Sequence, residues 1–212
     1  NFDNWQEAMN NQDETLINMK DVQELEKMYA RQYFEVITST LRKYDTNHLY
    51  LGCRFTRKLK PLHLLKIAGQ YCDVVTVNVY SYEPDEAQMS AWYSATGRPI
   101  LIGEHHAALK GKRQLPLRWQ VFDEKERYDY LTNYISTWAR QPYSLGSHWY
   151  QYSDQHLTGR SSNGENQIVG MVDITDQPHQ ELVRAVRDVS KKVYEMHFQE
   201  VKMDKKAMPG SI

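Results

Sequence analysis

Residues 98–106 read RPILIGEHH, and residues 73–80 read DVVTVNVY. Each stretch contains a short, almost unbroken run of apolar and β-branched residues, which is typical of a strand covered on both faces. Strands of that kind belong to parallel sheets, because the helices that connect parallel strands lie on the faces of the sheet. In the first stretch, Glu104 directly follows the apolar run. The two stretches predict an α/β fold in which a carboxylate stands at the end of a buried strand.

Strand and helix patterns alternate along the rest of the chain. A long amphipathic helix in front is predicted by apolar residues at four-residue steps, namely Leu25, Tyr29, Tyr33, Ile37 and Leu41. The predicted strands cover residues 48–55, 73–80, 100–103 and 143–152, and the predicted helices that follow them begin at Pro61 or cover residues 86–94, 128–138 and 182–196. Four strands that are each followed by a helix require a parallel sheet with right-handed crossovers.

Polar segments bound this repeating pattern. We expect residues 1–21 to form a polar loop or leader, residues 22–199 to form one α/β unit, and residues 200–212 to form a polar tail. A chain of 212 residues is long enough to bury one sizeable core. The sequence therefore predicts one domain.

The composition argues against several classes of partner. The 26 Lys and Arg residues nearly balance the 27 Asp and Glu residues, so we expect neither a nucleic-acid partner nor a membrane partner. No apolar run approaches the roughly 20 residues that span a bilayer. Cys53 and Cys72 have neither the spacing of a disulfide framework nor that of a zinc ribbon. The 15 Tyr and 5 Trp residues suit stacking against sugars, or packing of helices onto a sheet.

Polar side chains gather where the predicted strands end. They are Arg54, Asn78, Tyr80, Glu104, His105, His106, Trp149 and Gln151. Barrels built from β/α units place their active sites at the carboxyl ends of the strands. An open doubly wound sheet has the same alternation of elements, so the alternation alone leaves both architectures open. The position of the polar residues favours part of a barrel.

Two residues of this group have the chemistry of a sugar-cleaving site. Glu104 is either a glycosidase nucleophile, oriented by donors such as Tyr80 or Asn78, or one partner of a structural salt bridge, with Arg54 as the candidate cation. Trp149 either forms the apolar floor under a pyranose ring or packs in the core. Its neighbours His148 and Gln151 make the surroundings more polar than plain packing requires.

The segment 154–176 has the composition of a binding loop. It is long, contains glycine, and is rich in side chains that can bond hydroxyl groups, or alternatively can hold the backbone of the loop itself. The candidate substrate-binding residues are Arg54, Asn78, Tyr80, His106, His148, Trp149, Gln151, Asp154, Arg160, Glu165 and Asn166.

The histidines near the strand ends raise the alternative of a metal-dependent hydrolase. His105 and His106 are adjacent, so on a strand they point to opposite faces and cannot both bind one ion without a local twist. No HxH or HExxH motif and no ligand-spaced Asp cluster occurs in the sequence. We therefore expect no metal and no other cofactor.

Three stretches resemble the retaining barrel hydrolases of glycoside hydrolase clan A, most closely the agarases of family 50. They are YDTNHLYLGCRF at 44–55, RPILIGEHH at 98–106, and GSHWYQYSDQHLTGRSSNGENQIVGMVDITD at 146–176, and the resemblance covers nearly all of residues 30–195. It implies that residues 22–199 are the C-terminal half, strands five to eight, of a (β/α)8 TIM barrel. By the same resemblance Glu104 matches the nucleophile at the end of strand seven, Trp149 the strand-eight aromatic, and Tyr80 the strand-six tyrosine that contacts the nucleophile.

The resemblance implies a retaining glycoside hydrolase that acts on a β-linked polysaccharide or oligosaccharide and is agarase-like or β-galactosidase-like. The acid/base of the clan lies in an Asn-Glu pair after strand four, and no adjacent Asn-Glu pair occurs in this chain. An N-terminal half of the same barrel would therefore supply it. A non-catalytic carbohydrate-binding remnant is the alternative, and the substrate class suggests a secreted or periplasmic protein.

Overall fold

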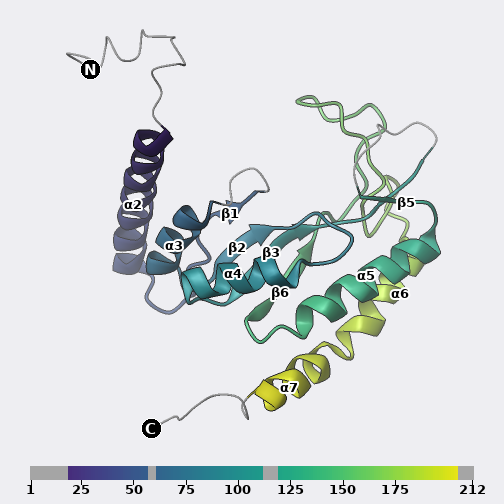
Figure 1. Ribbon diagram of the computed structural model, residues 1–212. Coiled ribbons are helices and arrows are strands. Elements are labelled where there is room, and N and C mark those ends of the chain that lie inside the picture. The colour runs from purple at the N-terminus through teal and green to yellow at the C-terminus, as the bar shows by residue number, and fades with distance from the viewer. Residues whose placement is uncertain (1–18, 57–60, 112–118, 205–212) are drawn as a thin grey trace.

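The computed structural model describes residues 19–56, 61–111 and 119–204. The helices are α2 (Met19–Tyr44), α3 (Leu62–Tyr71), α4 (Glu86–Thr96), α5 (Glu124–Ala139), α6 (Gln180–Ser190) and α7 (Val193–Asp204). The strands are β1 (Arg54–Phe55), β2 (Val75–Asn78), β3 (Ile100–His105), β4 (Ala108–Leu109), β5 (Gln120–Val121) and β6 (Ser144–Trp149). Figure 1 shows β1, β2, β3 and β6 side by side, with α2 and α3 toward one edge and α5, α6 and α7 toward the other.

The main sheet has the order β1-β2-β3-β6, and every pairing in it is parallel. A helix follows each of its four strands along the chain. The predicted α/β fold with a parallel sheet is confirmed. Because all four strands run parallel, their carboxyl ends meet at the same edge.

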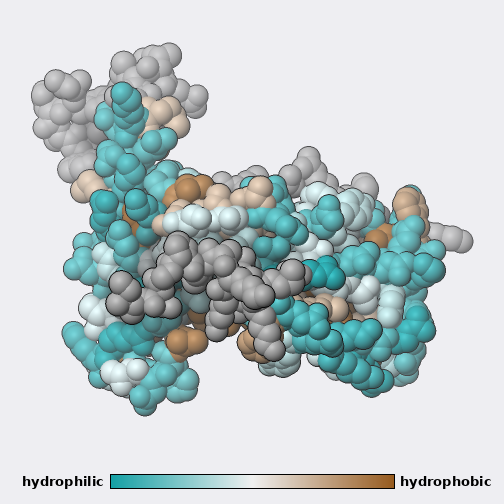
Figure 2. Space-filling model, turned by 60° about the horizontal axis from the view of Figure 1, so that its bottom comes forward, coloured by the Kyte–Doolittle hydropathy of each residue, from teal (hydrophilic) through white to brown (hydrophobic). Residues whose placement is uncertain are grey.

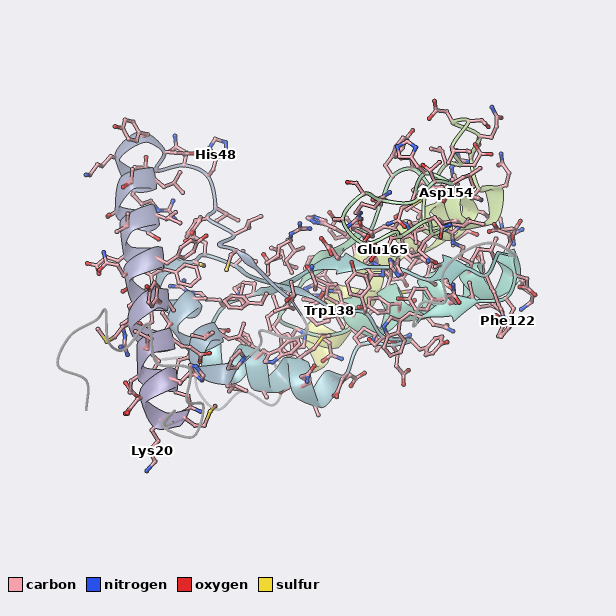
Figure 3. All side chains as sticks on the ribbon, turned by 90° about the horizontal axis from the view of Figure 1, so that it is seen from above. Lys20, His48, Phe122, Trp138, Asp154 and Glu165 are labelled. Carbon is pink, nitrogen blue, oxygen red and sulfur yellow. The ribbon has the colours of Figure 1, made fainter. Side chains whose placement is uncertain are left out.

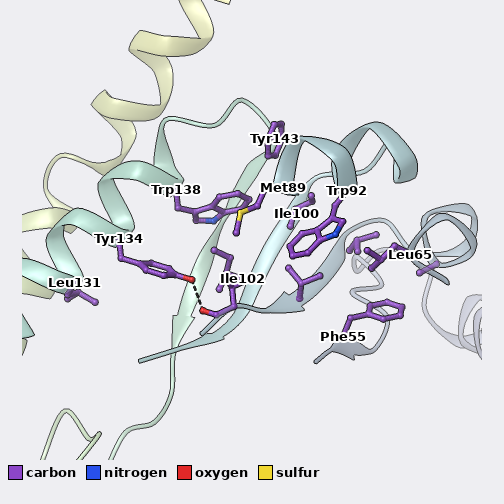
Figure 4. Close-up of a cluster of buried hydrophobic side chains, with 14 of the residues drawn as sticks. Phe55, Leu65, Met89, Trp92, Ile100, Ile102, Leu131, Tyr134, Trp138 and Tyr143 are labelled. Atoms are coloured by element: carbon purple, nitrogen blue, oxygen red, sulfur yellow. Dashed lines mark hydrogen bonds between the residues drawn. The ribbon is translucent and has the colours of Figure 1, made fainter. Parts of the chain in front are cut away.

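One face of the sheet forms the core with the helices. Ile100 and Ile102 alternate along β3 and are fully buried, together with Met89 and Trp92 of α4 and Trp138 of α5 (Figure 4). Apolar burial of this kind contributes about 1.5–3 kcal/mol for each large side chain. On the same face, the Tyr134 hydroxyl of α5 donates a hydrogen bond of 2.7 Å to the Val79 carbonyl and so joins the helix to the sheet (Figure 4).

The predicted strand 48–55 is shorter than expected. Only Arg54 and Phe55 pair with β2. Gly52 has a φ of +65°, which interrupts an extended run, and its Cα lies so close to Cys72 that a Cβ would stand 2.5 Å from the sulfur. A glycine in a strand often marks such a close approach, and here it delays the start of the strand.

The predicted helix 182–196 is two helices. The apolar face of α6, with Leu182, Ala185 and Val189 buried, packs on α5, and the chain then turns before α7. In α7 the Nδ1 atom of His197 lies 2.8 Å from the carbonyl oxygen of Ala139 at the end of α5. A straight continuation of α6 was predicted because the apolar spacing continues through the turn.

Other boundaries also differ from the sequence prediction. Helix α2 begins at Met19 and α7 ends at Asp204, so the helices extend into the expected leader 1–21 and the expected tail 200–212. The rest of those two segments lies outside the described residues. The two-residue strands β4 and β5 pair in parallel within the segment after Glu104, where only a loop was predicted.

The apolar stripe predicted on the first helix is largely uncovered. Phe34 is buried, whereas Leu25, Tyr29 and Tyr33 are 45%, 73% and 48% exposed. In the space-filling view most of the visible face is hydrophilic, and the exposed hydrophobic residues form separate patches on it (Figure 2). No helix in the described ranges is both long and apolar enough to cross a membrane.

Candidate active site

Glu104 stands near the carboxyl end of β3 with two partners, one from β1 and one from the segment that follows β2. Its Oε1 atom lies 2.5 Å from Nη1 of Arg54, and its Oε2 atom accepts a hydrogen bond of 2.6 Å from the Tyr80 hydroxyl. The Glu104 side chain is 15% exposed. The carboxylate is therefore fixed by one donor on each oxygen and still reaches solvent.

The backbone beside Glu104 brings these side chains together. A Cβ on Gly103 would stand 2.7 Å from Thr76 Cγ2 and 2.9 Å from both Arg54 Cδ and Asn78 Oδ1. Three side chains from β1 and β2 thus pack over the glycine, on the face of β3 away from Ile100 and Ile102. The register of β2 and β3 shifts at Asn78, which places that residue opposite Glu104.

The Tyr80 phenol donates to Glu104 and holds its own proton firmly. Burial first, and then the hydrogen bond to Glu104, raise the pKa of Tyr80 well above its ordinary value. The phenol therefore keeps its proton through the neutral and mildly alkaline range. Its ring also lies 4.8 Å from the His106 ring and 6.5 Å from the Tyr150 ring, measured between centroids.

The two histidines after Glu104 point to opposite faces, as expected for adjacent residues on a strand. His105 stacks on Tyr134 of α5 at 4.3 Å and is buried on the helix side. Burial lowers the pKa of His105 to about 3 and that of His106 to about 4, so both rings are neutral at neutral pH. His106 lies beside Tyr80, the residue whose hydroxyl bonds the Glu104 carboxylate.

Trp149 is half-buried and has structural contacts as well as a position at the strand end. Its Nε1 donates to the Val169 carbonyl at 2.7 Å, and its ring meets the His105 ring edge-on at 5.4 Å. The Arg127 guanidinium lies 5.7 Å from the ring centroid. These contacts describe core packing, and a role of the ring as an aromatic wall for a sugar stays a prediction.

The segment after Trp149 returns over the strand ends. Arg160 bonds the Tyr150 hydroxyl and lies 3.4 Å from Glu165, so it is linked to the residues around Tyr80. The Gln151 amide donates to Ser153 in the same turn, at 2.8 Å. Asn166 donates to the Leu157 carbonyl at 3.5 Å. Figure 3 shows Glu165 and Asp154 on the side of the molecule away from α2, which carries Lys20.

Two predicted binding residues lie elsewhere. Both carboxylate oxygens of Asp154 are engaged, one by His179 at 2.9 Å and one by the Gly170 amide at 2.6 Å. His148 is exposed on β6 and lines a cavity of about 760 Å³ bounded by α5, α6 and α7. Glu104 is not among the residues that line this cavity.

One buried charge was missed in the sequence. Arg127 is fully buried, although it is an arginine on a surface helix. Its position gave a signal: Arg127, Leu131 and Trp138 follow the spacing of one helix face, so the arginine occupies a core position. Among the described residues no group of three or more His, Cys, Asp or Glu side chains could hold a metal ion.

Comparison with known proteins gives two curated sequence relatives. Beta-agarase B of Vibrio sp. (strain JT0107) is 33% identical over 183 residues, which are 84% of this chain and 19% of the relative. Beta-agarase A of the same organism is 30% identical over 182 residues, or 82% of this chain and 18% of the relative. No family model matches the chain.

Solved structures give the same result. An exo-beta-agarase matches with a TM-score of 0.75 and 36% identity, covering 81% of this chain and 23% of its own. An agarase named AgWH50C matches with a TM-score of 0.75 and 33% identity, covering 81% and 27%. The chain spans less than a fifth of the curated relatives it matches. The predicted resemblance is thus confirmed: this chain is similar over most of its length to one segment of the beta-agarases, and is agarase-like.

Proposed function

We propose that this chain carries the nucleophile side of a retaining glycoside hydrolase that cleaves a β-linked polysaccharide or oligosaccharide. The observation that carries the proposal is the Glu104 carboxylate, near the end of a central parallel strand, bonded by Arg54 at 2.5 Å and Tyr80 at 2.6 Å. Enzymes of this kind need an ionised carboxylate of fixed orientation that a sugar can reach. The similarity to beta-agarases supports agarose or a related galactan as the substrate.

We further propose that the sheet is strands five to eight of a (β/α)8 barrel and that an N-terminal half completes it. Both edges of the main sheet support this assignment. Near the β1 edge, α2 exposes Tyr29, and at the β6 edge Leu145, Tyr194 and Phe198 are 51%, 74% and 54% exposed. Parallel strands are almost always covered on both faces, and apolar surface at both edges suits burial against further β/α units.

The chemistry follows from the position of Glu104. One Oε atom forms a bond to the anomeric carbon while the bond from that carbon to the glycosidic oxygen breaks, and the leaving oxygen takes a proton from an acid. A water molecule then attacks the same carbon, releases Glu104 and returns a proton to that acid. The acid/base would come from the N-terminal half, with its carboxyl group about 5 Å from that of Glu104.

The substrate contacts that we propose lie around this carboxylate. Trp149 and His106 offer ring faces, and Arg160, Glu165 and Asn166 offer hydroxyl partners from the returning segment. A binding remnant without catalysis is the second candidate, since this chain contains no Asn-Glu pair.

Covalent trapping in the complete enzyme tests the proposal. A fluorosugar of matching configuration should label Glu104, which peptide mass spectrometry identifies, and Glu104→Gln should abolish turnover. Glu86→Gln, which removes an exposed carboxylate at the start of α4, is the matched control and should leave turnover unchanged. Label on another carboxylate, or turnover in Glu104→Gln, would show that the nucleophile is not Glu104. Substrate binding without any turnover in the unaltered enzyme would favour the remnant.

A further inference from the structure

Four charged side chains meet behind Trp149, away from the Glu104 carboxylate. Asp154 Oδ2 lies 2.9 Å from Nε2 of His179, and Glu124 Oε1 lies 3.3 Å from Nδ1 of the same ring. Glu124 also lies 3.9 Å from Arg127. The Arg127 side chain is fully buried, and those of Asp154 and His179 are 7% and 16% exposed. We call these four residues the ion cluster.

The ion cluster ties together segments that are distant in sequence. Glu124 and Arg127 belong to the first turn of α5, Asp154 follows β6, and His179 immediately precedes α6. Buried charges are costly unless they are paired, so each member depends on the others. Within the segment 150–179, the stretch from Asp154 to His179 is therefore fixed at both of its ends.

Arg127 connects the ion cluster to Trp149. Its guanidinium donates to the Ala107 carbonyl at 3.2 Å and to the Gly170 carbonyl at 3.1 Å. The carbonyl of Val169, the residue before Gly170, accepts the hydrogen bond from the Trp149 indole. The guanidinium also lies 5.7 Å from the indole centroid, close enough for a cation–π contact. The ring is thus held at its face by the Arg127 guanidinium and at its nitrogen by the Val169 carbonyl.

The same stretch is anchored to Asp154. The Gly170 amide donates to Asp154 Oδ1 at 2.6 Å, and a Cβ at Gly170 would stand 2.3 Å from the Asp154 nitrogen. Beyond Trp149, the Tyr150 amide donates to the His105 carbonyl at 2.9 Å, next to Glu104. A continuous path of contacts therefore leads from His179 through Asp154 and Gly170 to Trp149 and, by way of the Tyr150 amide, to the residue that follows Glu104.

We propose that Arg127, Asp154 and His179 are positioning residues, which hold Trp149 and the segment 150–179 in the geometry that a sugar ring requires beside Glu104. This inference rests on the proposed function. It also assigns Asp154 a role in shaping the site in place of direct contact with substrate.

The charge of His179 makes the arrangement sensitive to pH. The hydrogen bond to Asp154 first, and then that to Glu124, raise the pKa of His179 to about 9, and burial and Arg127 oppose the rise. Asp173 is the other carboxylate that interacts with this ring. The pKa is raised on folding, so the contribution of the charged ring is complete below the ordinary value near 6.5 and is lost as the pH rises through about 9.

Binding measured without turnover tests the inference in the complete enzyme. In a Glu104→Gln background, the affinity for agarose oligosaccharides would be measured by calorimetry between pH 6 and pH 10. Adding His179→Gln should weaken binding roughly 10- to 100-fold at pH 7, because displacement of a positioning contact by about 1 Å has effects of that order. The loss of affinity above about pH 9 in the parent should be absent in this double variant. His179→Lys, which keeps a charge to about pH 10, should restore part of the affinity.

His63→Gln is the matched control, because His63 pairs with Glu26 at 3.1 Å between α3 and α2, far from Trp149. Hydrogen exchange should rise in residues 150–179 only in the His179 variant. Faster exchange with unchanged affinity would overturn the inference and leave the ion cluster with a purely structural role, as would equal effects of His63→Gln. If the parent binds no oligosaccharide and the unaltered enzyme is not labelled at Glu104, the proposed function is overturned, and the inference with it.

Discussion

Replacement of Tyr80 by phenylalanine removes one hydroxyl group from the candidate site and leaves the ring in place. The hydroxyl donates to Glu104 Oε2 at 2.6 Å, within the range of charge-assisted bonds to carboxylates. A hydrogen bond to a charged group contributes about 1.5–3 kcal/mol, and each 1.36 kcal/mol is a factor of ten in rate. The Glu104 side chain is 15% exposed, so water replaces part of the lost bond. We therefore expect the rate of Glu104 labelling in Tyr80→Phe to fall roughly 10- to 50-fold.

Tyr134→Phe provides the matched control for this measurement. It also removes a buried tyrosine hydroxyl, which donates at 2.7 Å to the Val79 carbonyl on the helix side of the sheet. That bond is neutral, so its loss costs about 1 kcal/mol of stability and should leave the labelling rate within about threefold. The assay is the pseudo-first-order rate of covalent labelling by a fluorosugar, followed by intact mass. Equal labelling rates in Tyr80→Phe and the unaltered enzyme would refute the role of Tyr80 as the donor that orients the nucleophile.

Three further changes have expected outcomes. Trp149→Ala should weaken substrate binding and also lower the melting temperature, because the indole bonds Val169 and packs on His105; a calorimetric scan with unchanged melting would contradict the packing. Gly103→Ala should cost about 1–3 kcal/mol and reduce turnover, since its Cβ would stand 2.7 Å from Thr76; denaturant unfolding and a rate assay that match the unaltered enzyme would count against this crowding. Residues 1–212 expressed alone should be aggregated or molten in gel filtration and near-ultraviolet circular dichroism, because both sheet edges expose apolar surface; a cooperative monomeric transition would exclude the half-barrel.

The parallel sheet was predictable because its central strands carry their own evidence. The runs at 73–80 and 98–106 are apolar throughout, and a strand covered on both faces needs such a run. Strand β1 was less predictable, since Gly52 has a positive φ and packs closely against Cys72, a contact that the local sequence does not report. The turn between α6 and α7 was missed because the apolar spacing runs through it, and that spacing does not report the contact of His197 with Ala139 that accompanies the turn.

The arrangement around Glu104 was also predictable in part. Parallel strands bring their carboxyl ends to one edge, so Arg54, Tyr80 and Glu104 could be grouped from strand positions alone. The ion cluster could not, because its contacts join residues such as Arg127 and Gly170, which are 43 positions apart and lie partly in irregular structure. No periodicity of sequence reports a contact between a helix and a returning loop. The only local signal was an arginine on the apolar face of α5.

The ion pair between Arg54 and Glu104 unites two interpretations of Glu104 that stood as alternatives in the sequence. The salt bridge is formed, at 2.5 Å, yet the arginine side chain is 56% exposed. An ion pair with so exposed a partner contributes little to stability, on the order of 0–1 kcal/mol. Stability is therefore a weak reason for a carboxylate at the end of a buried strand, where a neutral residue would avoid the desolvation cost. The pair instead holds one oxygen of the carboxylate, while Tyr80 holds the other, in the fixed orientation that the proposed nucleophile needs. On this argument the salt bridge is the resting state of the proposed nucleophile.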